Sequence, residues 1–115
     1  MNKDDLIKDY WLVFNNQRWN ELVNYFTTDA NIIWPHTKET FTVKQFIEIN
    51  SNYPGNWLIS LKEKLNLNDS MITVVEVSDE IKSYHAVSFF KFKDDKITEL
   101  KEYWGENVNI PDWRK

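Results

Sequence analysis

The hydrophobic pattern changes its period near Trp57, and this change limits the chain to folds that combine helices with an antiparallel sheet. Before this point apolar residues recur every three or four positions, as they do in amphipathic helices. Trp57, Ile59 and Leu61 then alternate with polar residues, as in a strand with one buried face. Helices followed by strands predict an α+β fold, and we expect residues 1–115 to form one domain.

Three amphipathic stretches precede the change of period. The first is expected to be capped by Asp4 or its neighbour and to end at residues 15–17. The second covers residues 19–26. Thr42 and Gln45 have the spacing of a capping box, so the third helix should begin there.

Polar doublets divide the rest of the chain into runs that are typical of hairpins. The doublets are Asn68-Asp69, Asp79-Glu80 and Asp94-Asp95, and the runs cover residues 70–78, 81–93 and 96–104. A short strand is expected at residues 31–34, and Ile110 and Trp113 are expected to anchor the C-terminal residues.

If each doublet is a two-residue turn, counting outward places Val74 opposite His85 and Val87 opposite Glu102. One face of the sheet would then hold Glu63, Glu76, His85, Val87, Phe89, Leu100, Glu102 and Trp104. A histidine among carboxylates on an apolar surface suits general acid–base catalysis, because burial and neighbouring charge separate pKa values. The alternative is that Glu63 and Glu76 lie at the sheet margin and that His85 is a core or interface histidine.

Aromatic residues are unusually frequent, with six Trp, seven Phe and five Tyr. So many rings must fill a thick core, line a pocket or cover a partner. Trp11, Trp34, Trp57 and Trp104 are candidates for an aromatic cage around a small ligand, with the plain core as the alternative.

Several classes of function are disfavoured by composition. The net charge is −4 and the lysines are scattered among acids, so we expect no nucleic-acid partner. The chain has no cysteine and two glycines, His36 and His85 are too far apart for a helical ligand pair, and no calcium or zinc loop is present. We therefore predict no metal and no cofactor. The acidic N-terminus and the absence of a long apolar run predict no membrane partner and a cytoplasmic location.

Five segments carry a resemblance that covers nearly the whole chain. They are residues 10–14 (YWLVF), 19–22 (WNEL), 25–32 (YFTTDANI), 90–97 (FKFKDDKI) and 102–106 (EYWGE). With the order of elements, they resemble the nuclear transport factor 2-like superfamily, in its SnoaL-like and ketosteroid-isomerase-like branch. The resemblance implies a cone-shaped half-barrel, with three N-terminal helices packed on a strongly curved, mostly antiparallel sheet. It also implies a mostly apolar pocket and a homodimer formed through the outer sheet face.

The resemblance also assigns roles to single positions. Tyr10 falls where the isomerase branch keeps a tyrosine that stabilises an oxyanion. Trp34 stands in place of that branch's proton-shuttling aspartate, and Val87 or Ser88 stands in place of its second acid. Trp104 falls where an aromatic wall of the pocket is found.

Three functions remain open from these observations. The first is a cofactor-free isomerase, cyclase or hydratase acting on a small apolar carbonyl compound. In it the catalytic residues are Tyr10, His85, His36 and Glu102, and the ligand-binding residues are Trp11, Trp34, Glu76 and Trp104. The second is a ligand-binding or sensing module for a small hydrophobic or aromatic molecule. The third is a dimerising scaffold whose pocket is filled by side chains.

Overall fold

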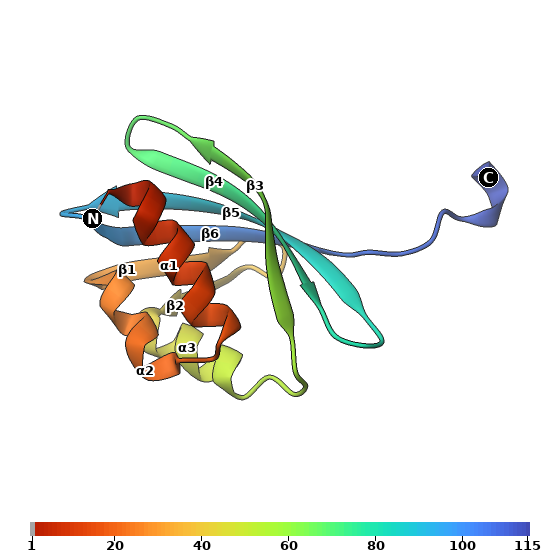
Figure 1. The fold of residues 1–115 in the computed structure, drawn as a ribbon, viewed down its shortest axis with the longest axis horizontal. Helices are drawn as coiled ribbons and strands as arrows, with labels where there is room; N and C mark the ends of the chain where they lie inside the picture. The colour runs from red at the N-terminus through yellow and green to blue at the C-terminus, as the bar shows by residue number, and fades with distance from the viewer. Residues whose placement is uncertain (1) are drawn as a thin grey trace.

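A curled six-stranded sheet holds three helices on one side in the computed structural model, which describes residues 2–115 (Figure 1). The helices are α1 (Lys3–Asn15), α2 (Trp19–Leu22) and α3 (Val43–Ser51), with short 3-10 turns at Val23–Tyr25 and Asp112–Arg114. The strands are β1 (Phe26–Trp34), β2 (Glu39–Thr42), β3 (Leu58–Asn66), β4 (Ser70–Ser78), β5 (Ser83–Lys93) and β6 (Lys96–Glu106). This order confirms the predicted α+β class.

Side-chain caps fix where α1 and α3 begin. Asn2, rather than Asp4 or Asp5, caps α1 by accepting a hydrogen bond of 2.8 Å from the backbone N–H of Asp5. The two aspartates lie in the first turn, where their charge favours the positive end of the helix dipole. Thr42 and Gln45 form both bonds of the predicted capping box.

The segment between α2 and α3 is more extended than the sequence pattern indicated. The second helical stretch ends at Tyr25, and β1 begins at Phe26, five residues before the strand expected at residues 31–34. β2 pairs with β1 over residues 39–42 and was not predicted. The alternation of residues 39–42 is too short to stand out from a loop in the sequence.

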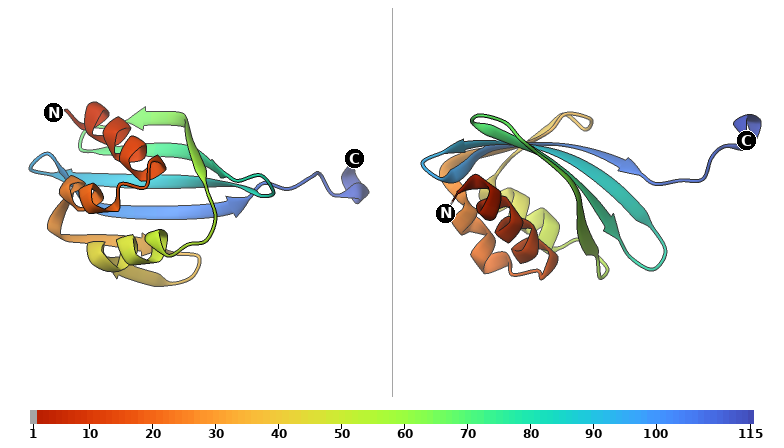
Figure 2. Two further views of the ribbon diagram at one scale, coloured as in Figure 1. Left: turned by 60° about the horizontal axis from the view of Figure 1, so that its bottom comes forward. Right: turned by 45° about the horizontal axis from the view of Figure 1, so that its top comes forward.

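The strand order β2-β1-β6-β5-β4-β3 makes the sheet mixed but mostly antiparallel. β1 runs parallel to β6, and every other neighbouring pair is antiparallel. The sheet curls around α1, α2 and α3, which all lie on its concave side (Figure 2). This arrangement confirms the predicted curved sheet with helices packed on it.

The second hairpin keeps the predicted faces, and the first keeps them only from Glu63 to its turn, because a bulge between Leu61 and Glu63 shifts the register and places Leu61 opposite Val75. The turn at Asn68-Asp69 places Glu63 opposite Val74, as expected. The next turn is centred one residue later than expected, so Val74 lies opposite Val87 instead of His85. This difference shifts the pairing by two residues, and a shift of two leaves each side chain on the same face.

The third hairpin reverses the predicted faces. Asp94 and Asp95 form the expected turn, with φ angles of 53° and 62°. A bulge between Lys91 and Phe92 then shifts the register by one residue, so that Glu102 lies opposite Ser88 and not opposite Val87. The predicted face that joined His85 to Glu102 and Trp104 is therefore wrong.

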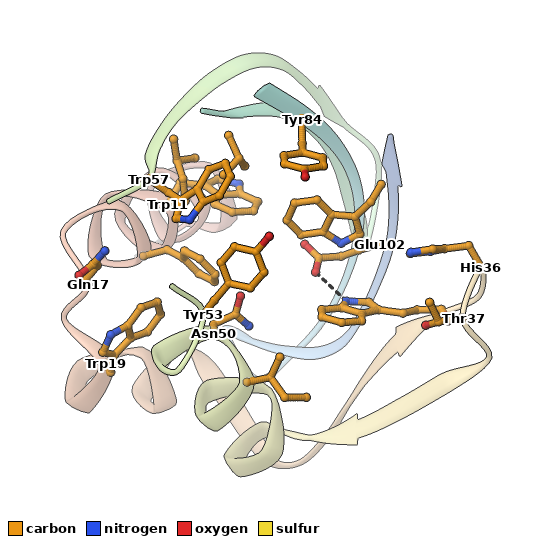
Figure 3. A pocket seen from close by; sticks show the side chains of 16 residues that line it. Trp11, Gln17, Trp19, His36, Thr37, Asn50, Tyr53, Trp57, Tyr84 and Glu102 are labelled. Carbon is orange, nitrogen blue, oxygen red and sulfur yellow. Dashed lines mark hydrogen bonds between the residues drawn. The ribbon is translucent and has the colours of Figure 1, made fainter. Parts of the chain in front are cut away.

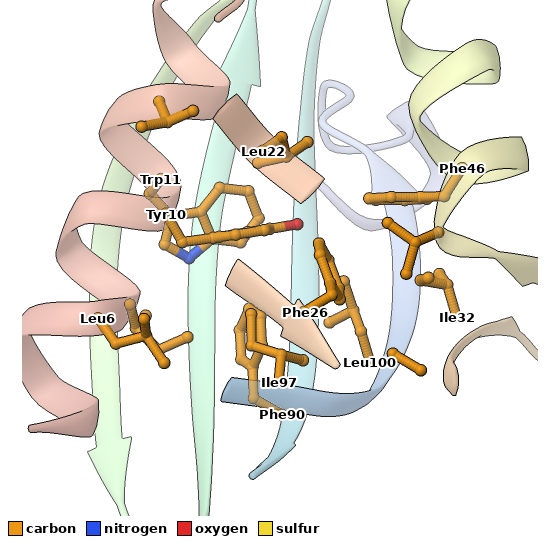
Figure 4. Packing of buried hydrophobic residues seen from close by; sticks show 14 of the residues in the cluster. Leu6, Tyr10, Trp11, Leu22, Phe26, Ile32, Phe46, Phe90, Ile97 and Leu100 are labelled. Atoms are coloured by element: carbon orange, nitrogen blue, oxygen red, sulfur yellow. The ribbon is translucent and has the colours of Figure 1, made fainter. Parts of the chain in front are cut away.

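The apolar core fills the end of the half-barrel next to the β5–β6 turn. Leu6 and Ile7 from the start of α1 pack there with Phe90 and Ile97, and Phe46 of α3 closes the other side (Figure 4). Tyr10, Trp11 and Val13 from the later turns of α1 also belong to this core. Toward the opposite end of the half-barrel, the space lined by Trp34, Trp57 and Trp104 is left open.

The C-terminal residues do not pack on the domain as predicted. Ile110 and Trp113, the expected anchors, are 60% and 81% exposed. The segment after β6 projects away from the sheet (Figure 1). Its first residue, Asn107, is held by a hydrogen bond of 2.8 Å from its backbone N–H to the carbonyl of Ser83.

Candidate functional site

A cavity of about 300 Å³ opens at the unfilled end of the half-barrel. Eight aromatic side chains line it, namely Trp11, Phe14, Trp19, Trp34, Tyr53, Trp57, Tyr84 and Trp104 (Figure 3). This volume lies at the small end of the range for ligand pockets. The cavity therefore has room for a molecule of modest size.

The lining follows from simple periodicities. Trp11 and Phe14 are three residues apart on α1, so both face the sheet. Glu102 and Trp104 are two residues apart on β6, so they share its concave face. Trp34 ends β1, which lies beside β6 in the sheet.

Glu102 is the buried polar group of the cavity, with a residue exposure of 2%. The indole N–H of Trp34 donates to its Oε1 across 3.1 Å, and the hydroxyl of Ser88 donates to its Oε2 across 2.8 Å. Burial raises the pKa of Glu102, because the charged form loses its hydration, while the two hydrogen bonds act in the opposite direction. The carboxyl group is thus held in place and is easier to protonate than a glutamate in water.

Tyr10 does not line the cavity. It is fully buried, its ring packs against those of Trp11, Phe26 and Phe90, and its hydroxyl has no hydrogen-bonding partner within residues 2–115. Its pKa is raised well above the usual value by burial and by the charge of Glu102. Tyr10 thus lies behind the cavity wall, close enough to Glu102 for the carboxylate charge to raise the pKa of its hydroxyl.

His85 and Glu76 lie opposite one another on β5 and β4, on the outer face of the sheet. His85 is exposed, packs over Gly105 and donates from Nδ1 to Oδ1 of Asn107 across 2.8 Å. The structure therefore brings these two residues together, but away from Glu102. The bulge in the β5–β6 hairpin is the physical cause.

The remaining predicted residues meet at the cavity. Trp11, Trp34 and Trp104 line it with Glu102, and His36 joins them from the loop after β1. His36 is exposed, so it lies at the rim. Of the two histidines considered as a base, His36 alone lies on the cavity lining.

Ser88 was missed as a functional residue, although the buried Ala86 and Phe90 flank it on the same face. A polar residue in phase with two buried apolar ones is the signal that could have found it. The resemblance places one acid of the isomerase branch at Trp34 and the second at Val87 or Ser88, and Trp34 and Ser88 are the two residues that bond Glu102. Both donate to Glu102, so the buried acid of this chain lies on β6 instead.

The described residues contain neither a metal-binding cluster nor a membrane-spanning helix. Within residues 2–115, no three His, Asp or Glu side chains gather closely enough to hold a metal ion. No helix in this range has the length and apolar character needed to cross a membrane.

Comparisons with known proteins find likeness in structure only. No protein-family model and no curated protein matches the chain. A protein from Kribbella flavida proposed to be a ketosteroid isomerase has 22% identity and a TM-score of 0.84, over 96% of this chain and 83% of its own. A protein from Shewanella putrefaciens proposed to be a SnoaL-like polyketide cyclase has 11% identity and a TM-score of 0.74, over 90% and 80%.

A third structure was solved with a bound small molecule. This protein from Catenulispora acidiphila, of ketosteroid isomerase-like fold and in complex with trimethylamine, has 11% identity and a TM-score of 0.70, over 89% of this chain and 86% of its own. Identities this low establish the fold and not the activity. The chain has the nuclear transport factor 2-like fold, which it shares with ketosteroid-isomerase-like and SnoaL-like structures.

Proposed function

We propose that this protein binds a small, mostly apolar organic molecule in the aromatic cavity, with Glu102 as the polar contact. The supporting observation is one buried carboxyl group in the lining of a mostly apolar cavity. Burying a carboxyl group costs free energy, and such groups concentrate at functional sites. The open cavity of about 300 Å³ disfavours the third hypothesis, a dimerising scaffold whose pocket is filled by side chains.

A second candidate is a cofactor-free acid–base enzyme of the isomerase, cyclase or hydratase class. It is favoured by the raised pKa of Glu102, since a carboxyl group that titrates nearer to neutral pH can both accept and return a proton. Glu102 would take a proton from the carbon next to a carbonyl group, and His36 at the rim would exchange protons with solvent. The hydroxyl of Tyr10 is outside the lining, so this mechanism does not use it to polarise the carbonyl.

The ligand class extends beyond carbonyl compounds. The trimethylamine complex of the Catenulispora acidiphila protein adds small amines to the molecules worth testing. A binding or sensing module needs the same cavity and no proton transfer. The two functions therefore differ in what Glu102 does after the ligand is bound.

The outer face of the sheet is the proposed homodimer contact. Val74, Val87 and Phe89 are half-buried there, and Tyr103 is exposed beside Phe89. These side chains come from β4, β5 and β6 and form a continuous apolar surface. Burial of such a surface between two copies would remove it from water.

Calorimetric titration with 2-indanone, a small aromatic ketone, tests ligand binding. Ile49 lines the cavity and Ile81 lies in an exposed turn, so Ile49→Trp and Ile81→Trp place the same bulk inside and outside. We expect Ile49→Trp to weaken binding more than about ten-fold, and Ile81→Trp to leave it unchanged. Equal affinities in both variants, or no binding by the wild type, would contradict the proposal.

Exchange of the 2-indanone C–H protons with D₂O, followed by NMR, separates binding from catalysis. An enzyme would accelerate this exchange above the buffer rate, and Glu102→Gln would abolish the acceleration while retaining affinity. A binding module would leave the exchange at the buffer rate. The same preparations serve both measurements.

A further inference from the structure

We infer that the cavity selects an organic cation, an alkylated ammonium group held between aromatic ring faces and the ionised carboxylate of Glu102. This inference rests on the proposed ligand-binding function and specifies the chemical class of the ligand. Its support comes from the charge, the ring geometry and the hydrogen bonding of the lining.

The charges of the lining favour a cation. Glu102 is its acidic group, and no Lys or Arg side chain contributes to it within residues 2–115. The other titratable groups are His36, which lies at the exposed rim, and the phenols of Tyr53 and Tyr84. A permanent positive charge inside would therefore meet one opposite charge and no permanent like charge.

The rings surround the cavity instead of stacking flat. Trp34 and Trp104 meet at 74° with centroids 6.3 Å apart, on the side of Glu102. Trp57 meets Tyr84 at 53° and Tyr53 at 58°, with centroid distances of 5.7 and 5.5 Å (Figure 3). Steep angles between neighbouring rings present π surfaces in several directions, and a cation is attracted to such surfaces at distances of up to about 6 Å.

Most of the indole N–H groups are already engaged by the protein. Those of Trp11, Trp34 and Trp57 donate to Thr73, Glu102 and the carbonyl of Pro54, respectively. These rings therefore offer a ligand their π surface and not their donor, which disfavours an anion. Nε1 of Trp104 is buried and has no partner within residues 2–115, so this donor remains for an oxygen atom on the ligand.

Cation binding should be coupled to the proton on Glu102. Burial raises the pKa of this carboxyl group, and a bound cation would lower it again by favouring the charged form. The other titratable groups around it are Tyr10 behind the wall, His36 at the rim, and Tyr53 and Tyr84 in the lining. A cation should therefore displace a proton, whereas a neutral molecule of equal shape should not.

Choline and 3,3-dimethylbutan-1-ol provide a matched test, because they share shape and hydroxyl group and differ in the positive charge. We expect calorimetry of the whole chain near neutral pH to show choline binding more than about ten times tighter than the alcohol. At pH values where Glu102 is partly protonated, choline binding should release a proton, seen as a dependence of the heat on the ionisation enthalpy of the buffer. Binding of the alcohol should show no such dependence.

Two variants of β6 locate the charge that is responsible. Glu102→Gln keeps the shape of the side chain and removes its charge, so it should weaken choline binding and abolish the preference for choline over the alcohol. Glu99→Gln makes the same change on the outward side of β6, at a surface ion pair with Lys91, and should retain the preference. Circular dichroism of both variants confirms that they are folded.

The outcomes separate this inference from the proposed function. Equal affinities for choline and the alcohol, or a preference for choline that survives Glu102→Gln, would overturn the cation inference. Binding of 2-indanone without binding of choline would overturn it too and would leave the ligand-binding function standing. Failure of 2-indanone, choline and the alcohol to bind would overturn both.

Discussion

The indole N–H of Trp34 donates to Oε1 of Glu102 across 3.1 Å, and this bond joins the end of β1 to β6 inside the cavity. Ser88 on β5 donates to the other carboxyl oxygen across 2.8 Å. Each oxygen of an ionised carboxylate accepts more than one hydrogen bond, so Glu102 retains capacity for a ligand. Three adjacent strands thus orient one buried acid.

The first prediction concerns the pH dependence of stability. Because burial raises the pKa of Glu102, the folded chain binds more protons than the unfolded chain between the unperturbed pKa of 4.5 and the raised pKa. The extra proton on Glu102 stabilises the folded chain at low pH, so the free energy of unfolding falls as pH rises through that interval. Urea unfolding of the wild type and Glu102→Gln from about pH 4 to about pH 8 should show the wild type losing stability relative to the variant. A constant difference, or one that grows in favour of the wild type, would count against a raised pKa.

The second prediction concerns Tyr10. Its buried hydroxyl has no partner within the described residues, so Tyr10→Phe should leave the free energy of unfolding unchanged or raise it by up to about 1 kcal/mol. Affinity for 2-indanone should not change, because Tyr10 is outside the lining. Urea unfolding and calorimetry check the two statements. A large loss of affinity would instead support the oxyanion role implied by the resemblance.

The third prediction tests the position of His85 on the outer face. A Cβ atom added at Gly105 would lie 2.6 Å from Cε1 of His85, so Gly105→Ala must displace the ring and its bond to Asn107. We expect a cost of about 1 kcal/mol in the wild type and little cost in a His85→Ala background. A double-mutant cycle in urea measures this coupling. Equal costs in both backgrounds would show that the ring does not cover Gly105.

Much of the fold could be predicted because its signals are local. The capping box at Thr42, the turn at Asp94-Asp95 and the change of period at Trp57 each depend on a few neighbouring residues. The face reversal depends on a distant contact instead. The bulge leaves Thr98 unpaired in the β5–β6 ladder, and Thr27 of β1 donates to its hydroxyl across 3.3 Å. No local pattern contains that information.

For the site too, features within one strand could be predicted and contacts between strands could not. Glu102 stood out because Leu100 and Trp104 flank it in phase on one strand, which needs no pairing information. Its connection to Ser88 required the register of β5 against β6, and one bulge decided that register. The cavity itself depends on where the core stops, which is set by the packing of α1 and α3 against the sheet.

The fourth prediction concerns the outer sheet face. If two copies join through it, Val87→Lys should convert the dimer to a monomer, because it places a charge in a desolvated contact. Val23→Lys makes the same substitution at an exposed position on the helical side and should leave the dimer intact. Sedimentation equilibrium distinguishes the two. A monomeric wild type, or a dimer unaffected by Val87→Lys, would contradict the proposed contact.

The pKa of Glu102 with and without a ligand tests most directly whether this carboxyl group contacts a molecule in the cavity. Carbon-13 NMR of the labelled side-chain carboxyl, assigned by its loss in Glu102→Gln, follows the titration. We expect a pKa above the unperturbed 4.5 that rises further when 2-indanone excludes water from the carboxyl group. A pKa in the ordinary range that does not respond to 2-indanone would contradict the assignment of the cavity as a ligand site built around Glu102.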